Sequence, residues 1–256
     1  MANVLITGAA RGLGAELSRH WPQEDTLYLL DVDKNSLHQL THELQSRGQE
    51  VHSLHVDLLQ DSNHDWVAKL PAVLDVLVHN AGIVFGGAFH QVTWNQHSIT
   101  LNLNLQTPIR LTHQLWPQIM ASQSPEILFI SSASSLIGFP FASSYAASKW
   151  GLSGFAESLR LEALEQKRPL KVTVICPSYI RTELFDGARA PRLFPYLEPK
   201  SLASWILKRR DGRVHYAPLL VRALPLLLAV VPQKVRDSLM NLLGVQQGMK
   251  HWRGRS

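Results

Sequence analysis

Short apolar runs alternate with stretches of helical periodicity along most of the chain. The apolar runs are mostly continuous and bounded by turn residues, which is typical of strands buried on both faces of a sheet. We expect strands at residues 3–7, 26–30, 50–56, 74–78, 126–131 and 170–175, and a seventh at 213–217. Helical patterns lie between them, at residues 12–20, 35–47, 61–70, 93–120, 145–167 and 199–209. This alternation predicts an α/β fold, a doubly wound parallel sheet of about seven strands with helices on both faces.

One domain, residues 1–256, accounts for nearly the whole chain, because we find no internal repeat, low-complexity tract or linker. Residues 183–212 begin with a segment rich in proline, arginine and aromatic residues, which predicts a substrate loop or lid. Residues 218–256 form an apolar and basic C-terminal extension, and we expect its tail after Gly248 to be frayed. The apolar reach at 217–232 contains Arg222 and Pro225 and falls short of the ~20 residues that span a bilayer.

Composition excludes several classes of protein. Apolar residues make up 45% of the 256 and charged residues 18%, which rules out a wholly disordered chain and allows a sizeable core. The single cysteine, Cys176, excludes a disulfide framework, and the 12 histidines show no ligand spacing, so we predict no metal site. The start shows no secretory signal, so we expect a cytoplasmic protein.

The net charge of +5 hides an asymmetry between two parts of the chain. Residues 1–186 carry 12 basic and 17 acidic side chains, whereas residues 187–256 carry 13 and 3. The basic part contains no nucleic-acid-reading motif, so we expect no nucleic-acid partner. An apolar face over residues 219–243 could instead contact a membrane surface, or be buried in an oligomer. The basic side chains available to anionic lipid would be Lys234, Arg236, Lys250, Arg253 and Arg255.

A glycine-rich turn, Thr-Gly-Ala-Ala-Arg-Gly-Leu-Gly, follows the first predicted strand and opens the first helix. Gly8, Gly12 and Gly14 fall where a Cβ would keep a dinucleotide pyrophosphate away from the helix N-terminus. Tight packing of helix on strand would also explain them. Asp31 ends the second strand 17 residues after Gly14, and its carboxylate favours NAD because it would repel a 2′-phosphate. Arg11 in the turn favours NADP instead, because it could contact that phosphate. We give Asp31 more weight and expect NAD, with NADP as the alternative.

Polar residues also follow the third and fourth predicted strands. Asp57 could accept a hydrogen bond from an adenine amino group, or it could cap the helix expected near residue 61. The run His-Asn-Ala-Gly, residues 79–82, ends the fourth strand at the edge where a ligand crevice should lie.

A tyrosine and a lysine open the long helix expected at 145–167. Tyr145 and Lys149 are spaced i, i+4, which places the phenol and the ammonium group on one face. A fixed cation, together with the positive nicotinamide of an oxidised coenzyme, stabilises a phenolate. We therefore expect a lowered pKa for Tyr145 and proton exchange with a substrate hydroxyl. Ser132 lies 13 residues earlier, in a cluster of hydroxyl side chains that follows the fifth strand.

Together these motifs resemble the short-chain dehydrogenase/reductase family over residues 2–182, with weaker likeness beyond. The resemblance implies a Rossmann-like fold in which Tyr145 is the general acid/base, Ser132 bonds the substrate oxygen and Lys149 binds the nicotinamide ribose. It also implies an asparagine that holds a water in a proton relay. Asn102 and Asn104 are both candidates, and counting back from Pro117 selects Asn104. The cofactor contacts it implies are Gly8, Arg11, Gly12, Leu13, Gly14, Asp31, Asp57, Leu58, Asn80, Ala81, Gly82, Tyr145, Lys149, Pro177, Ile180 and Thr182.

A separate argument also points to Asn104. Pro108 has no N–H, so the carbonyl four residues earlier loses its helical partner and could accept a bond from water. The alternative is that Pro108 simply kinks an exposed helix. This chain departs from the family pattern at two positions. Ser178 replaces the glycine of the family's Pro-Gly stretch, and His79 replaces the first asparagine of its Asn-Asn-Ala-Gly motif.

We therefore predict an NAD(P)-dependent alcohol dehydrogenase or carbonyl reductase that moves hydride between nicotinamide and a secondary alcohol or ketone. The segment after Thr182 is largely apolar, which favours a steroid, a retinoid or a long-chain alcohol. Its apolar residues are Leu184, Phe185, Leu193, Phe194, Pro195, Tyr196 and Leu197. The alternatives are a protein peripheral to a membrane and a dinucleotide-sensing protein without turnover.

The resemblance further implies a homodimer or homotetramer formed through the family's fourth and fifth helices. Apolar positions in the two corresponding stretches are compatible with such pairing. They are Leu103, Leu111, Leu115, Leu152, Phe155 and Leu159.

Overall fold

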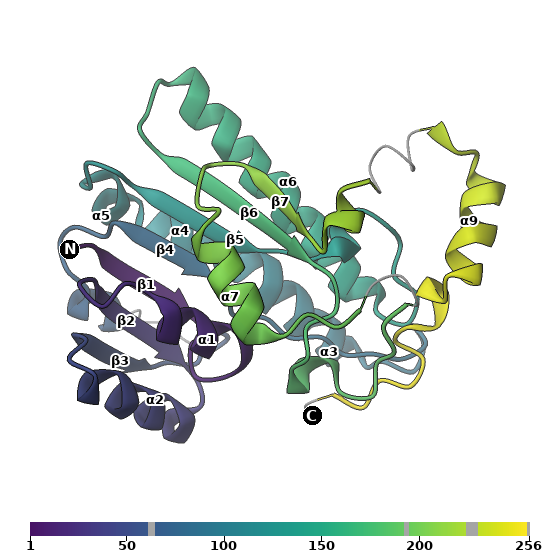
Figure 1. The fold of residues 1–256 in the computed structure, drawn as a ribbon, viewed down its shortest axis with the longest axis horizontal. Coiled ribbons are helices and arrows are strands. Elements are labelled where there is room, and N and C mark those ends of the chain that lie inside the picture. The colour runs from purple at the N-terminus through teal and green to yellow at the C-terminus, as the bar shows by residue number, and fades with distance from the viewer. Residues whose placement is uncertain (61–64, 192–194, 224–229, 255–256) are drawn as a thin grey trace.

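The computed structural model describes residues 1–60, 65–191, 195–223 and 230–254, and within these ranges seven parallel strands form one sheet (Figure 1). The strands are β1 (Asn3–Thr7), β2 (Thr26–Asp31), β3 (Val51–His55), β4 (Val76–His79), β5 (Glu126–Ile130), β6 (Lys171–Pro177) and β7 (Val214–Ala217). Their order in the sheet is β3-β2-β1-β4-β5-β6-β7. The chain builds outward from β1 to β3, then returns and adds β4 on the other side of β1, so the strand order reverses between β1 and β4. The predicted doubly wound parallel sheet is confirmed, and ligands of such sheets bind where the strand order reverses.

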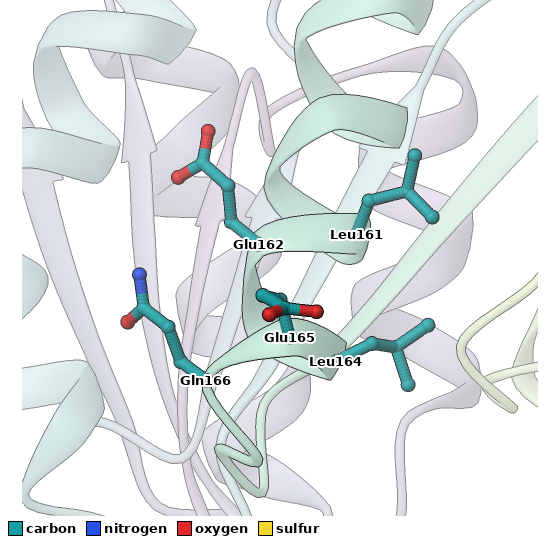
Figure 2. Close-up of a pocket in the computed structure, with 5 residues that line it drawn as sticks. All are labelled: Leu161, Glu162, Leu164, Glu165 and Gln166. Atoms are coloured by element: carbon teal, nitrogen blue, oxygen red, sulfur yellow. The ribbon is translucent and has the colours of Figure 1, made fainter.

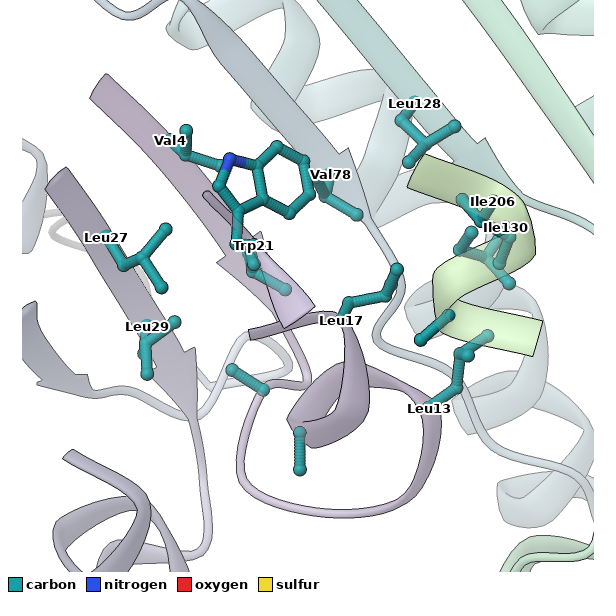
Figure 3. Close-up of a cluster of buried hydrophobic side chains, with 14 of the residues drawn as sticks. Val4, Leu13, Leu17, Trp21, Leu27, Leu29, Val78, Leu128, Ile130 and Ile206 are labelled. Atoms are coloured by element: carbon teal, nitrogen blue, oxygen red, sulfur yellow. The ribbon is translucent and has the colours of Figure 1, made fainter. Parts of the chain in front are cut away.

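Helices cover both faces of the sheet. The longer ones are α1 (Gly12–His20), α2 (Lys34–Ser46), α3 (Trp94–Leu101), α4 (Thr107–Gln114), α6 (Ser143–Glu165), α7 (Pro199–Leu207) and α9 (Gln233–Leu242). On one face, α1, α2 and α7 pack against alternate strand residues such as Val4 and Ile6 (Figure 3). On the other face, α4 and α6 pack with α5 (Trp116–Met120) against the intervening residues, including Leu5. This alternation follows from the two-residue side-chain period of a strand.

The helix predicted at 93–120 is not continuous. Between α3 and α4, residues Asn102–Gln106 form a π-helical segment, in which the N–H of Thr107 donates to the Asn102 carbonyl five residues back. Pro108 follows in the first turn of α4, where a missing N–H is tolerated. Of the helix predicted at 61–70, the structure shows a 3₁₀ turn at Asp65–Lys69, and residues 61–64 lie outside the described ranges.

One prediction about the C-terminal third is confirmed and one needs correction. The helix predicted at 199–209 is α7, which buries Ala203 and Ile206 in the core, and the role of 183–212 as a substrate loop or lid stays a prediction. The tail after Gly248 is not frayed as far as residue 254, since Met249 is buried and the indole N–H of Trp252 donates to the Leu184 carbonyl at 2.9 Å. We call residues 244–254 the C-terminal strap, because they lie against the loop that follows β6 (Figure 1).

Candidate active site

The glycine turn is held against the end of β4 by a network of hydrogen bonds. The Asn80 side chain donates to the carbonyls of Thr7 and Gly8, at 3.0 and 2.8 Å. The Thr7 hydroxyl donates to the Val78 carbonyl and accepts from the N–H of Asn80 and of Ala81. Asn80 was predicted as a coenzyme contact, and its side-chain amide fixes the shape of this turn.

Glycine is required in this turn by close approach of backbone to backbone. Gly8 has a φ of +64°, and a Cβ there would lie 2.7 Å from the Ala81 Cα. A Cβ on Gly14 would lie 2.0 Å from the Gly8 carbonyl oxygen, and one on Gly12 would lie 3.2 Å from a methyl carbon of Thr182. Gly8 and Gly14 therefore serve the packing of strand, turn and helix, which was the alternative weighed for them from sequence.

The N-terminus of α1 fits a phosphate group. Its N-cap residue, Arg11, makes no side-chain hydrogen bond to the helix, and the first turn contains no acidic residue. The first N–H groups of a helix need partners outside the helix, and together with the helix dipole they attract anions. Leu13 turns its side chain into the core, which leaves its backbone as the group that would meet a coenzyme here.

Arg11 is held by carboxylates beside the turn. It forms ion pairs with Asp33 and Glu183, and its Nε donates to the Ser36 hydroxyl at 3.0 Å. The backbone N–H of Ser36 and the charge of Arg11 hold the pKa of Asp33 below its usual value. Asp31 lies at the end of β2 and accepts from the N–H of Ala10 at 2.9 Å. Carboxylates of Asp31, Asp33 and Glu183 therefore lie around the glycine turn.

The remaining predicted coenzyme contacts are spread along the same edge of the sheet. Asp57 accepts from the N–H of Leu59 at 2.9 Å and so stabilises its own turn, while the Leu58 side chain is buried in the core. Pro177 ends β6, and the Ile180 carbonyl after it accepts from the N–H of Thr182.

Tyr145 and Ser132 meet at the start of α6. Tyr145 is the third residue of this helix and only 4% exposed, and the Ser132 side chain lies close enough to interact with its hydroxyl. Ser132 follows β5 and also accepts from the N–H of Ser134 at 3.1 Å. Burial raises the pKa of Tyr145 to about 12, and the interaction with Ser132 offsets this only in part. The lowered pKa expected from sequence requires the positive nicotinamide of an oxidised coenzyme beside the phenol as well as the lysine, and it stays a prediction.

Lys149 lies one helical turn after Tyr145, and its ammonium group is 5.8 Å from the centre of the phenol ring. It donates to the Ile130 carbonyl at 2.9 Å, and a Cβ on Gly82 would lie 3.7 Å from it. Burial lowers the pKa of Lys149 to about 8. The Lys149 ammonium group therefore lies where β4, β5 and α6 meet, and its burial there lowers the free energy of unfolding.

Asn104 lies inside the π-helical segment and is fully buried. Its side-chain amide both accepts from and donates to the backbone of Ile83, each at 2.8 Å, and donates to the Ser148 hydroxyl at 3.1 Å. A Cβ on Gly82 would lie 3.2 Å from its oxygen. Asn104 therefore joins the segment after β4 to α6, close to Lys149, whereas the side chain of Asn102, the other candidate, donates weakly to Ser98.

Comparison with known proteins identifies this arrangement. Residues 2–192 match the family described as short chain dehydrogenase. The chain belongs to this family. It is therefore an oxidoreductase of the short-chain dehydrogenase type.

Among curated relatives of this dehydrogenase, epidermal retinol dehydrogenase 2 of Mus musculus is 30% identical over 94% of this chain and 82% of the relative. The ketoacyl reductase HetN of a Nostoc species is 29% identical over 89% of this chain and 83% of the relative. Among solved structures, a short-chain dehydrogenase from Sphingobium yanoikuyae in complex with NADPH is 27% identical, with a TM-score of 0.77 over 94% of this chain and 96% of that one.

A cavity of about 50 Å³ lies beside Ser132 in this dehydrogenase. Its walls come from the segment after β5, the segment after β6 and the C-terminal extension. They are Ser132, Ala133, Ser134, Ile137, Phe139, Ser178, Tyr179, Phe185, Pro191, Val221 and Val245. Phe185 also packs edge-on against the Tyr145 ring, with 6.2 Å between ring centres. Sites for organic ligands are usually several times larger, so a bulky substrate requires these walls to move apart.

A larger depression, of about 550 Å³, lies at the other end of α6, about 30 Å from Tyr145 along the helix. Figure 2 shows its lining residues, Leu161, Glu162, Leu164, Glu165 and Gln166, on the last turns of that helix. Among the residues that the structure describes, only this end of α6 lines the depression, so we do not take it as a candidate active site.

Several residues around the site were not predicted from sequence. Ser148 completes the hydrogen bonds of Asn104, and its i+3 spacing from Tyr145 on the same helix could have singled it out. Tyr179, Val221 and Val245 line the cavity, and nothing in the local sequence places the last two near Ser132. Leu193 and Phe194, predicted to line the substrate segment, lie outside the described residues.

The positions proposed for subunit pairing are mostly buried within one chain. Leu111, Leu115, Leu152 and Leu159 pack in the core beneath α4 and α6 and are unavailable to a partner. This prediction was wrong for these four positions, because the same helical stripe faces the sheet. Leu103 and Phe155 are partly buried against that core, and the oligomeric state stays a prediction.

Proposed function

We propose that this dehydrogenase interconverts an apolar secondary alcohol and its ketone, as an alcohol dehydrogenase or carbonyl reductase. The observation that supports it most is the buried Tyr145 phenol with the Ser132 side chain close to it, Lys149 one turn away and an apolar cavity alongside. This combination supplies a proton-transfer group, a second hydroxyl for the reacting oxygen and a fixed cation.

Tyr145 transfers the proton, and Ser132 stabilises the reacting oxygen. In alcohol oxidation, the Tyr145 oxygen takes the proton of the substrate hydroxyl while Ser132 donates a hydrogen bond to the same oxygen. In ketone reduction, Tyr145 returns the proton. The nicotinamide coenzyme accepts or supplies the hydride when bound. Burial raises the pKa of Tyr145 to about 12, so the phenol is protonated at neutral pH and can serve as the acid in ketone reduction.

The coenzyme that we propose is NAD, with NADP as the alternative. Asp31 at the end of β2 supports this choice, as do the two carboxylates that hold Arg11. Fixed negative charges repel a 2′-phosphate, whereas a carboxylate accepts hydrogen bonds from ribose hydroxyls. The related Sphingobium protein was solved with NADPH, so the test compares both coenzymes.

The substrate that we propose is apolar, a steroid, a retinoid or a long-chain alcohol. The cavity walls beside Ser132 support this, since Ile137, Phe139, Phe185 and Val245 contribute apolar side chains. The name of the retinol dehydrogenase relative points in the same direction.

Tyr145→Phe tests the proposed reaction. We expect turnover of ketones to be lost at least about a hundredfold, because general acid catalysis contributes that much, while NADH still binds. Tyr28→Phe, on β2 away from the cavity, is the matched control. NADH fluorescence measures binding and the nicotinamide absorbance measures turnover. Full activity of Tyr145→Phe would refute the mechanism, and coenzyme binding without any turnover by the parent protein would favour the sensing alternative.

We also propose that the C-terminal extension contacts an anionic membrane surface. Figure 1 shows α9 standing away from the sheet, and apolar side chains on and before it are exposed, Val230 to 70%, Val235 to 58% and Leu242 to 72%. The exposed Lys234 lies on the same helix. An exposed apolar face with basic neighbours is typical of helices that lie in the membrane interface. In the described part of the chain, no helix is long and apolar enough to cross a bilayer.

Sedimentation with anionic vesicles at two salt concentrations tests this contact. We expect binding at low salt that weakens at high salt and is lost in a variant with Val235→Glu and Leu242→Glu. A variant with Leu161→Glu and Leu164→Glu, exposed on α6, is the matched control. No sedimentation of the parent protein at low salt would count against a membrane role.

A further inference from the structure

The chain encloses both catalytic hydroxyl groups. Tyr145 is 4% exposed and Ser132 is 8% exposed. The cavity beside Ser132 has a volume of about 50 Å³, enough for one or two waters at about 30 Å³ each, whereas sites for organic ligands usually exceed about 300 Å³. A ketone therefore reaches Tyr145 only when part of the enclosing structure moves away.

The C-terminal strap is part of this enclosure. Val245 of the strap lines the cavity beside Ser132. Met249 is 1% exposed and belongs to the same buried apolar cluster as Tyr145 and Phe185. The Phe185 ring packs edge-on against the Tyr145 ring. The strap and the loop that follows β6 therefore cover Tyr145 together.

Trp252 of the strap contacts the two segments that flank the catalytic serine. Its indole N–H donates to the carbonyl of Leu184, in the segment that follows β6, at 2.9 Å. Its ring packs edge-on against Phe85, with 6.3 Å between ring centres, and a Cβ on Gly86 would lie 2.8 Å from the Trp252 Cβ. Phe85 and Gly86 follow β4, and β4 and β6 are the neighbours of β5, the strand that Ser132 follows. Trp252 therefore joins the two sides of the ligand crevice expected at this edge of the sheet.

Main-chain hydrogen bonds attach the rest of the strap to the same loop. The N–H of Arg189 donates to the Gly248 carbonyl at 2.7 Å, and the N–H of Arg253 donates to the Asp186 carbonyl at 2.9 Å. The side chains of Lys250 and Arg253 are exposed, so the strap lies at the surface. Segments held by a few surface bonds open locally at a small part of the free energy of global unfolding. The strap can therefore open while the sheet stays folded.

We propose that the C-terminal strap is the part of the enclosure that moves aside for substrate, and that Trp252 determines specificity because it holds the strap closed. A ketone with more atoms around the reacting carbon displaces the strap further, so its apparent affinity is reduced more by the closed state. The inference rests on the proposed function, because Ser132 and Tyr145 define where the reacting carbon lies. The alternative is that the segment after β5 moves and the strap stays in place.

The first experiment compares cyclohexanone with 2-decalone, in which a second ring is fused to the same cyclic ketone. Trp252→Phe removes the hydrogen bond to Leu184, and Trp252→Ala also removes the ring. In Trp252→Phe, the ratio of kcat/KM for 2-decalone to that for cyclohexanone should rise by roughly 2- to 12-fold, the range for one hydrogen bond. Trp252→Ala should give a larger rise. Trp94→Ala, at a tryptophan of α3 that is 78% exposed, is the matched control and should keep the parental ratio. A parental ratio in both Trp252 variants would overturn the proposal.

A disulfide that locks the strap gives a second, reversible test. The Cβ atoms of a disulfide lie about 3.8 Å apart, so cysteines at positions 86 and 252 need only a small shift to bond. Gly86→Cys combined with Trp252→Cys should lose turnover of 2-decalone when oxidised and regain it with dithiothreitol. Each single variant should be insensitive to dithiothreitol, since Cys176 is 1% exposed. Undiminished turnover by the oxidised double variant would overturn the proposal, and so would failure of the disulfide to form, because the strap would then not be closed.

Binding separates this proposal from the proposed reaction. If the parent protein turns over neither ketone, the proposed reaction fails, and calorimetric titration of the double variant with 2-decalone in the presence of NADH still tests the strap. Binding to the reduced form that is lost in the oxidised form would support the strap as the moving part. Equal binding to both forms, or to neither, would overturn it.

Discussion

Replacing Lys149 by methionine should stabilise the fold while it removes activity. The side chain is 4% exposed, and burial lowers its pKa from the ordinary 10.5 to about 8. Each pKa unit corresponds to about 1.4 kcal/mol, so holding the ammonium group in place costs about 3 kcal/mol at neutral pH. Methionine has a similar length and carries no charge, but it leaves the Ile130 carbonyl without its donor, which costs about 1 kcal/mol. The net gain in unfolding free energy is therefore about 2 kcal/mol.

The pH dependence of this gain follows from the sign of the shift. Below pH 8 both the folded and the unfolded chain carry the Lys149 charge, so the folded state bears the full cost. Between about pH 8 and 10.5 the folded chain releases the proton first, and its stability rises relative to the unfolded chain. The advantage of Lys149→Met should therefore shrink above pH 8 and be lost near pH 10.

Urea unfolding of the parent protein and of Lys149→Met at pH 6.5, 8 and 10 measures this difference. At pH 6.5 the variant should also melt about 4 to 8 °C higher, given the size of the chain. Lys200→Met, an exposed lysine on α7, is the matched control and should change stability by less than about 0.5 kcal/mol. A variant that is less stable than the parent at pH 6.5, or a gain that persists unchanged at pH 10, would refute the reasoning.

Three further predictions concern the coenzyme side of the site. Asp31→Ser should raise the affinity for NADPH relative to NADH by about tenfold or more, because a fixed negative charge is removed. A fluorescence titration with both coenzymes measures the two affinities. An unchanged ratio between them would show that the carboxylate does not repel the 2′-phosphate. Asn104→Ala should lower the unfolding free energy by about 2 to 4 kcal/mol in urea, since both backbone groups of Ile83 lose their partner; a smaller loss would mean that water replaces the amide. Gly14→Ala should abolish coenzyme binding in the same titration, because a Cβ 2.0 Å from the Gly8 oxygen forces the turn open, and parental affinity would contradict this.

Sequence patterns predicted the parts of this protein that depend on local spacing. The strands were recognisable because both faces of a parallel sheet are buried, which leaves continuous apolar runs such as residues 127–130. Tyr145 and Lys149 could be paired because they are one turn apart on one helix. Ser132 could be placed because the carboxyl ends of parallel strands share one edge.

The remaining features depend on contacts between distant segments. The π-helical segment occurs where Asn104 bonds to Ile83, 21 residues earlier, and no local pattern encodes an extra residue in that turn. The pKa of Tyr145 depends on whether burial or the interaction with Ser132 is larger, and burial is a property of the assembled fold. Met249 and Trp252 read as isolated apolar residues in a basic tail, because their partners near Tyr179 and Leu184 are about 70 residues away.

The C-terminal strap has a consequence for engineering specificity by exchange of segments between relatives. The Arg189 N–H donates to the Gly248 carbonyl at 2.7 Å, and the N–H of Arg253 donates to the Asp186 carbonyl at 2.9 Å. A loop transplanted at 183–198 without its own chain end would lose both of these hydrogen bonds wherever the two segments no longer match. Chimeras of this dehydrogenase should therefore exchange the two segments as a pair.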